Sequence, residues 1–309
     1  MRILVTGAGL VGAHAAAALS SDHEVVLADI APDDRYVRSV AQDRVRLERC
    51  DVTDREGLRR LMANVNAVIH TAGLIGPLAQ SQPHQAFSVN VVGTLQVVEA
   101  ARLAGVDRLI YASTHGVYDF TRGPDEPMPE QSPTAAHSVY AASKLAAEQV
   151  LRAYADAYGM AIVALRFCNL FGRGRYVAGS RGGEAFNELI TSVARGEPGP
   201  IGSPLAGRSE WLYAKDAGRA VAAAVAAAVP TGFTIVNIGS GDLTGPDDLL
   251  RSISRVVPDA RFVTAGAPGR ERRQPFDLSR ARRVLRWAPT FTLEAAIADY
   301  IAEIRALAA

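Results

Sequence analysis

Cysteine is scarce in this chain of 309 residues, which contains only Cys50 and Cys168. Two cysteines that belong to no C-x-x-C pair cannot form a disulfide framework, so we expect a reducing, cytoplasmic compartment. Excess charge is also absent, because the net charge is +1. Such a balance excludes the electrostatic footprint of a protein that binds DNA, RNA or an acidic membrane.

Long hydrophobic runs are missing as well. No stretch approaches about 18 uninterrupted apolar residues, so we expect no transmembrane helix. The richest run, 217–229, is mostly alanine and contains Arg219, which is typical of a helix packed inside a protein. Histidines show no spacing that suits a metal, and we expect no metal site.

Short apolar, β-branched runs do occur, and they alternate with segments that have helical periodicity. This alternation predicts an α/β protein with a doubly wound parallel sheet, a Rossmann fold, covered by helices on both faces. The predicted strands are 2–6, 24–29, 45–49, 67–71, 108–113, 161–167 and 233–238. The predicted helices are 11–20, 54–64, 86–104 and 138–158.

The pattern becomes less regular after residue 168. Segments 172–183 and 196–207 are rich in Gly and Pro and are interpreted as loops, and 261–265 is the one small strand candidate of the C-terminal part. We therefore predict a second, smaller C-terminal lobe that binds the substrate. The predicted division is 1–167 plus 208–240 for the sheet domain and 168–207 plus 241–309 for the lobe.

A glycine-rich loop follows the first predicted strand. In "LVTGAGLVG", Gly7, Gly9 and Gly12 have the spacing G-x-G-x-x-G between a strand and a helix. The first glycine permits a tight turn, the second lets the backbone approach a pyrophosphate, and the third lets helix and strand pack closely. The helix N-terminus then offers free N–H groups to the phosphates. The loop predicts a dinucleotide site.

Asp29 ends the second predicted strand, where a carboxylate accepts hydrogen bonds from a ribose 2′-OH and repels a 2′-phosphate. This favours NAD over NADP. Arg35 and Arg38 lie nearby in the sequence and leave NADP as an alternative.

Tyr140 and Lys144 stand four residues apart in "SVYAASKLAAEQ", on one face of a predicted helix. A free phenol is a poor base at neutral pH, and a neighbouring ammonium is expected to lower its pKa. Tyr140 is therefore a candidate to take a proton from a substrate hydroxyl, or to return one to a carbonyl.

With these motifs, the sequence resembles the extended short-chain dehydrogenases/reductases, and in particular the NAD-dependent epimerase/dehydratase family. The resemblance extends over nearly the whole chain. It is carried by "TGAGLVG" (6–12), "DVTD" (51–54), "HTAG" (70–73), "NVVGT" (90–94), "STHGVY" (113–118), "YAASK" (140–144), "RFCNLFGRG" (166–174), "RSEWLYAKD" (208–216), "VNIGSG" (236–241) and the segment 276–297.

The resemblance implies a role for each matching position. The pyrophosphate would contact Gly7, Gly9, Leu10, Val11 and Gly12. Adenosine would contact Asp29, Asp51 and Val52, and the loop after the fourth strand would line the cofactor with Thr71, Ala72 and Gly73. Asn90 would be a structural or cofactor-side polar residue. Thr114, Tyr140 and Lys144 would be catalytic, with Tyr140 and Lys144 also touching the cofactor, and Thr114, His115, Asn169 and Arg208 would face the substrate.

The sequence departs from the family pattern in three places. Its glycine loop is one residue shorter between the first two glycines than T-G-x-x-G-x-x-G, and "SPLAG" (203–207) replaces the usual small turn before Arg208. A third departure is the run "GRERRQP" (269–275), where relatives hold a second arginine that contacts the nucleotide. Arg270, Arg272 and Arg273 are the alternatives for that position.

"STHGVY" bears on the reaction, because dehydratases of this family place Asp-Glu directly after the Thr. Here those positions are His115 and Gly116, so the paired carboxyl groups for elimination of water are missing and dehydration is disfavoured. His115 is interpreted as a substrate hydrogen-bond donor or as a packed loop histidine. Cys168 is expected to be a buried structural thiol.

Three functions remain open on the sequence. The first is a nucleotide-sugar 4-epimerase, and the second is a net NAD-dependent dehydrogenase of a sugar, a sugar acid or another small hydroxy compound. The third, a redox-sensing regulator, is disfavoured because the chain keeps the Tyr/Lys pair. Arg173, Arg175, Arg181 and Arg208 form either an anion-binding rim or a solvated surface. The resemblance also implies a homodimer through helices 86–104 and 138–158.

Overall fold

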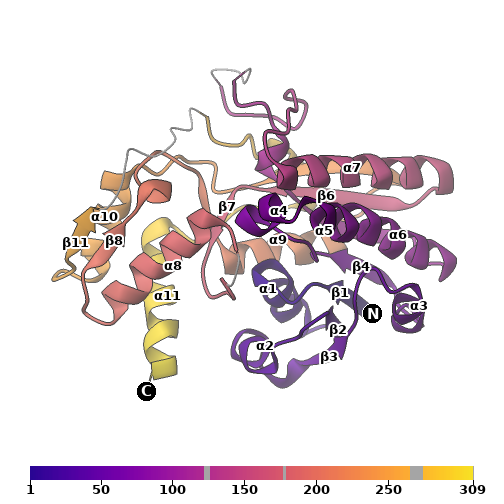
Figure 1. The fold of residues 1–309 in the computed structure, drawn as a ribbon, viewed down its shortest axis with the longest axis horizontal. Coiled ribbons are helices and arrows are strands. Elements are labelled where there is room, and N and C mark those ends of the chain that lie inside the picture. Colours follow the sequence, from indigo (N-terminus) through magenta and orange to yellow (C-terminus); the bar gives the residue numbers. More distant parts are fainter. Residues whose placement is uncertain (122–125, 177–178, 265–273, 309) are drawn as a thin grey trace.

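A seven-stranded parallel sheet forms the centre of the protein (Figure 1). The computed structural model describes residues 1–121, 126–176, 179–264 and 274–308. The strand order is β10-β6-β5-β4-β1-β2-β3. The strands are β1 (Arg2–Thr6), β2 (Glu24–Asp29), β3 (Val45–Arg49), β4 (Ala67–His70), β5 (Arg108–Thr114), β6 (Ala161–Phe167) and β10 (Gly232–Ile238). All seven predicted strands are thereby confirmed as members of one sheet.

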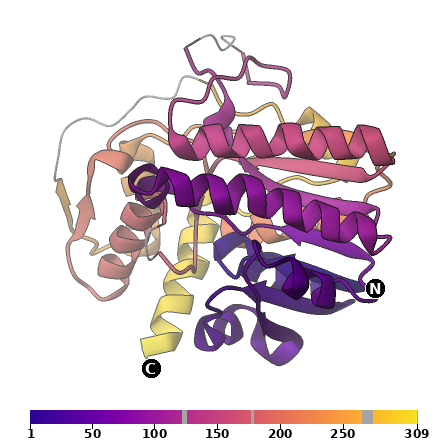
Figure 2. The same ribbon diagram turned by 45° about the vertical axis from the view of Figure 1, so that its right-hand side comes forward.

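Helices cover both faces of the sheet, as expected for strands whose side chains are buried on both sides. One face carries α1 (Leu10–Leu19), α2 (Asp34–Ala41) and α9 (Ala214–Ala226). The other carries α3 (Arg55–Leu61), α6 (Thr94–Leu103) and α7 (Val139–Tyr158). Figure 2 shows α6 and α7 lying side by side across this second face. The predicted doubly wound Rossmann architecture is therefore confirmed.

The predicted helix 86–104 is not one regular α-helix. It consists of α5 (Pro83–Phe87), a π-helical segment (η2, Ser88–Gly93) and α6. Three helices lie where the sequence predicts none: α2, α4 (Gly76–Ser81) and α8 (Arg181–Ala194).

The C-terminal lobe has its own hydrophobic core beside the sheet (Figure 1). Its elements are α8, β8 (Gly199–Ile201), α10 (Pro246–Val256), β11 (Phe262–Thr264) and α11 (Leu293–Ala308). The strand predicted at 261–265 is β11, which pairs in parallel with β8. Another short parallel pair, β7 (Asn169–Phe171) with β9 (Trp211–Tyr213), joins the lobe to the sheet.

Short helical turns complete the described structure: η1 (Gln42–Arg44), η3 (His115–Val117), η4 (Ser203–Leu205) and the π-helical η5 (Ala281–Leu285). The predicted domain division stays a prediction. Trp211 packs in the core of the lobe, whereas Phe276 and Trp287 pack in the core of the sheet. In the part of the chain that the structure describes, no helix has the length and apolarity to cross a membrane.

Candidate active site

The candidate site lies where the strand order reverses, between β1 and β4. Ligands of doubly wound proteins bind in the crevice outside the carboxyl ends of the strands at such a point. Two loops leave the sheet there, the glycine loop after β1 and the segment Thr71–Gly73 after β4. They touch, because a Cβ on Gly7 would lie 2.5 Å from the backbone nitrogen of Ala72.

The three loop glycines have different surroundings. Gly7 has a φ of +94°, which disfavours any other residue, and a Cβ on Gly12 would lie 1.8 Å from the carbonyl oxygen of Gly7. Gly9 has open space instead, since a Cβ there would meet nothing within 4 Å. No side chain caps the N-terminus of α1, so its first N–H groups remain available. This cradle fits a dinucleotide pyrophosphate.

Asp29 links the glycine loop to the end of β2. Its carboxylate accepts hydrogen bonds from the backbone N–H groups of Ala8 (2.7 Å) and Ala31 (2.9 Å). A carboxylate has further lone pairs, so it can also accept from a ribose hydroxyl. Arg38 is paired with Asp34 and Asp43 on the exposed side of α2. These contacts fit NAD better than NADP.

Thr71 and Asn90 support the two loops. The Thr71 hydroxyl donates to the carbonyl oxygens of Thr6 and Gly7, both at 2.9 Å. Asn90 is fully buried in the π-helical segment, where its Oδ1 accepts from the Leu74 N–H (2.7 Å) and its Nδ2 lies 2.8 Å from the Ser143 hydroxyl. These bonds fix the loop after β4, and the cofactor-side role of Asn90 stays a prediction.

The two predicted adenine contacts lie just beyond the end of β3. Asp51 Oδ1 accepts from the N–H and from the hydroxyl of Thr53, both at 2.8 Å, which fixes the turn into α3. Val52 is buried and lies close to Gly93. A Cβ added to Gly93 would come within 2.7 Å of Cγ2 of Val52.

Thr114, Tyr140 and Lys144 come together at the carboxyl end of β5. Ser138 caps α7 by accepting from the Ala141 N–H, which places Tyr140 in the first turn of the helix. The Thr114 side chain lies near the Tyr140 phenol and lowers its pKa. Lys144 is buried one turn later.

The pKa values of this group are governed by burial. Burial raises the pKa of Tyr140 to about 12, although the hydrogen bond with Thr114 acts in the opposite direction. Burial lowers the pKa of Lys144 to about 8, and the charge of Glu148 opposes that shift. The prediction that the neighbouring ammonium lowers the phenol pKa is therefore wrong for this structure. Lys144 Nζ instead donates to the carbonyl oxygen of Ala112, at 2.9 Å.

A buried ion pair behind these residues was not found from the sequence. Glu148 and Arg166 are joined by two hydrogen bonds, of 2.6 Å and 3.0 Å, and Ser113 donates to the same carboxylate at 2.5 Å. The spacing of Glu148 four residues after Lys144 is the signal that could have indicated it.

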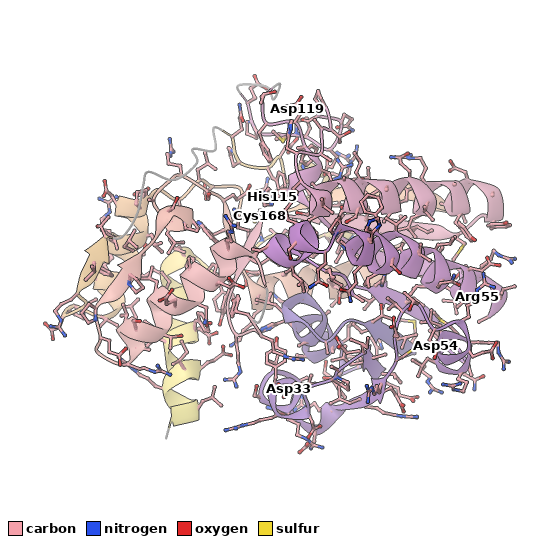
Figure 3. All side chains as sticks on the ribbon, in the orientation of Figure 1. Asp33, Asp54, Arg55, His115, Asp119 and Cys168 are labelled. Carbon is pink, nitrogen blue, oxygen red and sulfur yellow. The ribbon has the colours of Figure 1, made fainter. Side chains whose placement is uncertain are left out.

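His115 lies next to Thr114, with its Nδ1 3.1 Å from the carbonyl oxygen of Phe167. Its ring meets the edge of Phe120, with the ring centroids 5.9 Å apart. Cys168 is buried, as predicted for a structural cysteine. Figure 3 labels His115 and Cys168 close together, between α4 and the lobe.

Asn169 and Arg208 lie on the lobe side of the site. Asn169 donates from Nδ2 to the carbonyl oxygen of Glu210, at 3.2 Å. Arg208 is exposed at the start of α10, where a Cβ on Gly245 would lie 3.6 Å from its Cγ. Among the contacts of the described residues, none joins Arg208 to Thr114. The three alternatives for the second arginine, Arg270, Arg272 and Arg273, fall outside those residues.

A strap, residues 172–176, crosses from the lobe to the sheet domain. The carbonyl oxygen of Arg173 lies 2.9 Å from Nε2 of His14 on α1. Arg175 donates to the carbonyl oxygen of Ala31 (3.1 Å) and lies 3.7 Å from the carboxylate of Asp33. Beside it is an open hollow of about 660 Å³. Arg173 and Arg175 thus contact the sheet domain rather than forming a separate rim.

Among the described residues, no three His, Cys, Asp or Glu side chains gather as a metal site would require.

The sheet, the open glycine cradle and the Tyr140–Lys144 pair together define a dinucleotide-dependent enzyme of the short-chain dehydrogenase/reductase superfamily. More narrowly, the chain belongs to the NAD dependent epimerase/dehydratase family, whose model matches residues 3–239. The enzyme is therefore NAD-dependent, as predicted.

Relatives and solved structures agree with this family. The UDP-glucose 4-epimerase of Mycolicibacterium smegmatis is 30% identical over 97% of both chains. The dTDP-glucose 4,6-dehydratase of Mycobacterium tuberculosis is also 30% identical, over 94% of this chain and 89% of its own. The structure of MoeE5 in complex with UDP-glucose and NAD has a TM-score of 0.84 and 27% identity, and covers both chains completely.

Proposed function

We propose that this protein is a nucleotide-sugar 4-epimerase that uses Thr114, Tyr140 and Lys144 with NAD. The observation that carries the proposal is that Thr114, Tyr140 and the buried Lys144 come together at the carboxyl edge of the sheet. NAD supplies reversible hydride transfer when it is bound. The protein residues bind and orient the sugar and move its proton.

Tyr140 is the proton-transfer group in this proposal. Its phenolate would take the proton from the C4 hydroxyl of the sugar as the carbinol is oxidised, and the resulting phenol would return it when the carbonyl is reduced on the other face. Thr114 holds the reacting oxygen by a hydrogen bond. Lys144 follows one helical turn after Tyr140, where its side chain would contact the cofactor.

Dehydration is disfavoured by the residues after Thr114. Elimination of water needs an acid and a base beside the keto sugar. His115 is directed to the Phe167 carbonyl oxygen, and Gly116 has no side chain. A Cβ on Gly116 would make only ordinary contacts, the nearest at 3.5 Å, so space does not account for the missing side chain.

Nucleotide sugars are proposed as the substrate class because the relatives point to them. The names of both curated relatives contain a nucleotide sugar, and the MoeE5 complex contains UDP-glucose. The alternative is a net dehydrogenase with the same catalytic residues, which would release NADH.

One assay separates these reactions. The purified protein is incubated with NAD and, in turn, UDP-glucose, UDP-glucuronic acid and dTDP-glucose, and absorbance of NADH is followed while the sugars are separated by chromatography. We expect the 4-epimer to form without net NADH. Stoichiometric NADH would establish the dehydrogenase instead, and a 4-keto-6-deoxy product would establish a dehydratase.

Tyr140→Phe should lose activity by at least about 100-fold while still binding NAD; retained turnover would contradict the proposed role of Tyr140.

A homodimer through α6 and α7 is also proposed. Large apolar side chains are exposed along the helices of this face, and Figure 2 shows α6 and α7 adjacent there. The exposed apolar residues are Phe87, Val92, Leu95 and Leu103, with Tyr158 at the end of α7. A contiguous apolar face of this kind marks an interface. Leu95→Glu should convert a dimer into a monomer in analytical ultracentrifugation, whereas Leu307→Glu, on the exposed end of α11, should not; equal masses for the two variants would exclude this interface.

We assign the protein to the cytoplasm as part of the same proposal. Both cysteines are buried and neither takes part in a disulfide, which suits a reducing compartment.

A further inference from the structure

Three successive residues of β5 lie against α7, beside residues of the helix that are one turn apart. Ala112 accepts from Lys144 at 2.9 Å, Ser113 donates to Glu148 at 2.5 Å, and Thr114 lies beside Tyr140. Residues four apart on a helix face the same side, so Tyr140, Lys144 and Glu148 form one row along α7 that faces the end of β5. The row holds the proton-transfer residues in register with the strand that ends at the substrate.

Glu148 is the innermost member of this row. It is fully buried, and Arg166 on β6 pairs with its carboxylate through two hydrogen bonds. The guanidinium of Arg166 also lies 4.6 Å from the centroid of the Tyr118 ring. Glu148 therefore joins α7 to both strands that flank the catalytic edge.

Joining three elements through a buried ion pair carries a large desolvation penalty. Well-packed apolar residues of similar volume often stabilise a protein as well or better, because both charges must be removed from water. A carboxylate at this position does one thing that apolar residues cannot. It places a fixed negative charge one turn from the Lys144 ammonium.

We propose that Glu148 is a positioning residue for proton transfer, which fixes α7 against β5 and β6 and keeps the Lys144 side chain protonated in its buried position. This inference rests on the proposed role of Tyr140 and Lys144 in catalysis. It adds a charged residue that touches neither substrate nor cofactor.

The other groups that face Lys144 make Glu148 its only negative neighbour among the described contacts. From β5, the Tyr111 ring lies under the ammonium, with its centroid 4.5 Å from Nζ. From β4, His70 is buried and neutral, because burial lowers its pKa to about 3. Tyr140 on the same helix is a neutral phenol at physiological pH, because burial raises its pKa to about 12. Burial alone favours the neutral amine, and the charge of Glu148 is what opposes it.

The composition of the chain permits a direct test. Lys144 and Lys215 are its only two lysines. Protein labelled with ¹³C at lysine Cε therefore gives two lysine signals in an NMR titration, and Lys144→Arg assigns them. Lys215 is an internal reference at a remote site, where it is paired with Asp299 and Glu303 on α11.

The test compares the wild type with Glu148→Gln, which keeps an oxygen that accepts from Ser113 but removes the charge. We expect the pKa of Lys144 to fall by roughly one further unit while that of Lys215 stays constant. The alkaline limb of the pH profile of kcat should move down by the same amount. An unchanged Lys144 pKa would overturn the proposal, even if activity fell.

Three further variants complete the design. Glu148→Asp keeps the charge and should restore the Lys144 pKa. The double variant Glu148→Gln/Arg166→Gln should lower the Lys144 pKa without leaving a buried guanidinium unpaired, so it serves if the single variant does not fold. Glu99→Gln removes the partner of Arg102 in the more exposed pair on α6 and should change neither signal. A Lys144 pKa that shifts in a protein without epimerase activity would support the role of Glu148 while refuting the proposed function.

Discussion

The carboxylate of Asp29 accepts a hydrogen bond from the backbone N–H of Ala8, across 2.7 Å. The residue that is expected to select the cofactor therefore also holds the glycine loop at the end of β1. Its charge and its loop contact can be separated, because an asparagine oxygen can still accept from Ala8.

Asp29→Asn should reduce the preference for NAD over NADP. The substitution removes the charge that repels a 2′-phosphate but keeps an acceptor for the loop. We expect the ratio of the two dissociation constants to fall by roughly tenfold, which equals about 1.4 kcal/mol. Calorimetric titration with each cofactor measures it. Asp22→Asn, on the exposed turn before β2, is the control. An unchanged ratio would show that another residue selects the cofactor.

Thr114→Val should slow catalysis and change its pH dependence. Loss of the hydrogen bond to the reacting oxygen is expected to reduce kcat by about 100-fold. The same hydrogen bond lowers the pKa of Tyr140, so its removal should move the rising limb of kcat to higher pH. Steady-state rates measured across pH test both effects, with Thr134→Val on an exposed loop as the control. A rising limb that stays in place would mean that Thr114 does not influence the phenol.

Much of the fold is predictable from the sequence, because most strands of the sheet are short apolar runs and the edge strand β3 alternates apolar with charged residues. The pairing of Tyr140 with Lys144 is also predictable, since their spacing places them on one helix face. The direction in which the Tyr140 pKa shifts is not predictable from the sequence, because it depends on how deeply the tertiary structure buries the phenol. The pairing of Glu148 with Arg166 likewise joins separate elements. α8 was missed because its first residues lie within a Gly-rich stretch interpreted as loop.

Acid should destabilise the protein through two buried histidines. Burial lowers the pKa of His14 to about 4 and that of His70 to about 3. Below pH 6.5 the unfolded chain takes up protons on these imidazoles and the folded chain does not. Stability therefore falls as the pH decreases from 6.5 to about 4, by roughly 3 kcal/mol for each histidine.

Urea unfolding at a series of pH values measures this loss. The double variant His14→Gln/His70→Gln should show a much smaller decrease over the same range. His84→Gln, which changes an exposed histidine, should follow the wild type. If all three proteins lost stability equally, carboxylates rather than histidines would be responsible for the acid sensitivity.

Arg175→Ala should speed the release of NAD. The side chain of Arg175 ties the strap to Ala31 and Asp33, beside the end of β2 where adenosine is expected. Losing these contacts should raise the dissociation rate by up to about tenfold, or about 1.4 kcal/mol. Stopped-flow displacement of bound NADH measures the rate, and Arg195→Ala in the lobe is the control. Identical rates for all three proteins would mean that the strap does not retain the cofactor.

The π-helical segment Ser88–Gly93 changes the direction in which side chains point along the continuous helix formed by α5, η2 and α6. A π turn accommodates one residue more than an α turn, which offsets the side chains on either side of it by about 100°. Asn90 can thereby face the loop after β4, while Val97, Val98 and Ala101 face the sheet. With uniform α geometry, one of these two sets would turn away from its partners. Loss of a single residue here would therefore uncouple the support of the loop from the docking of the helix.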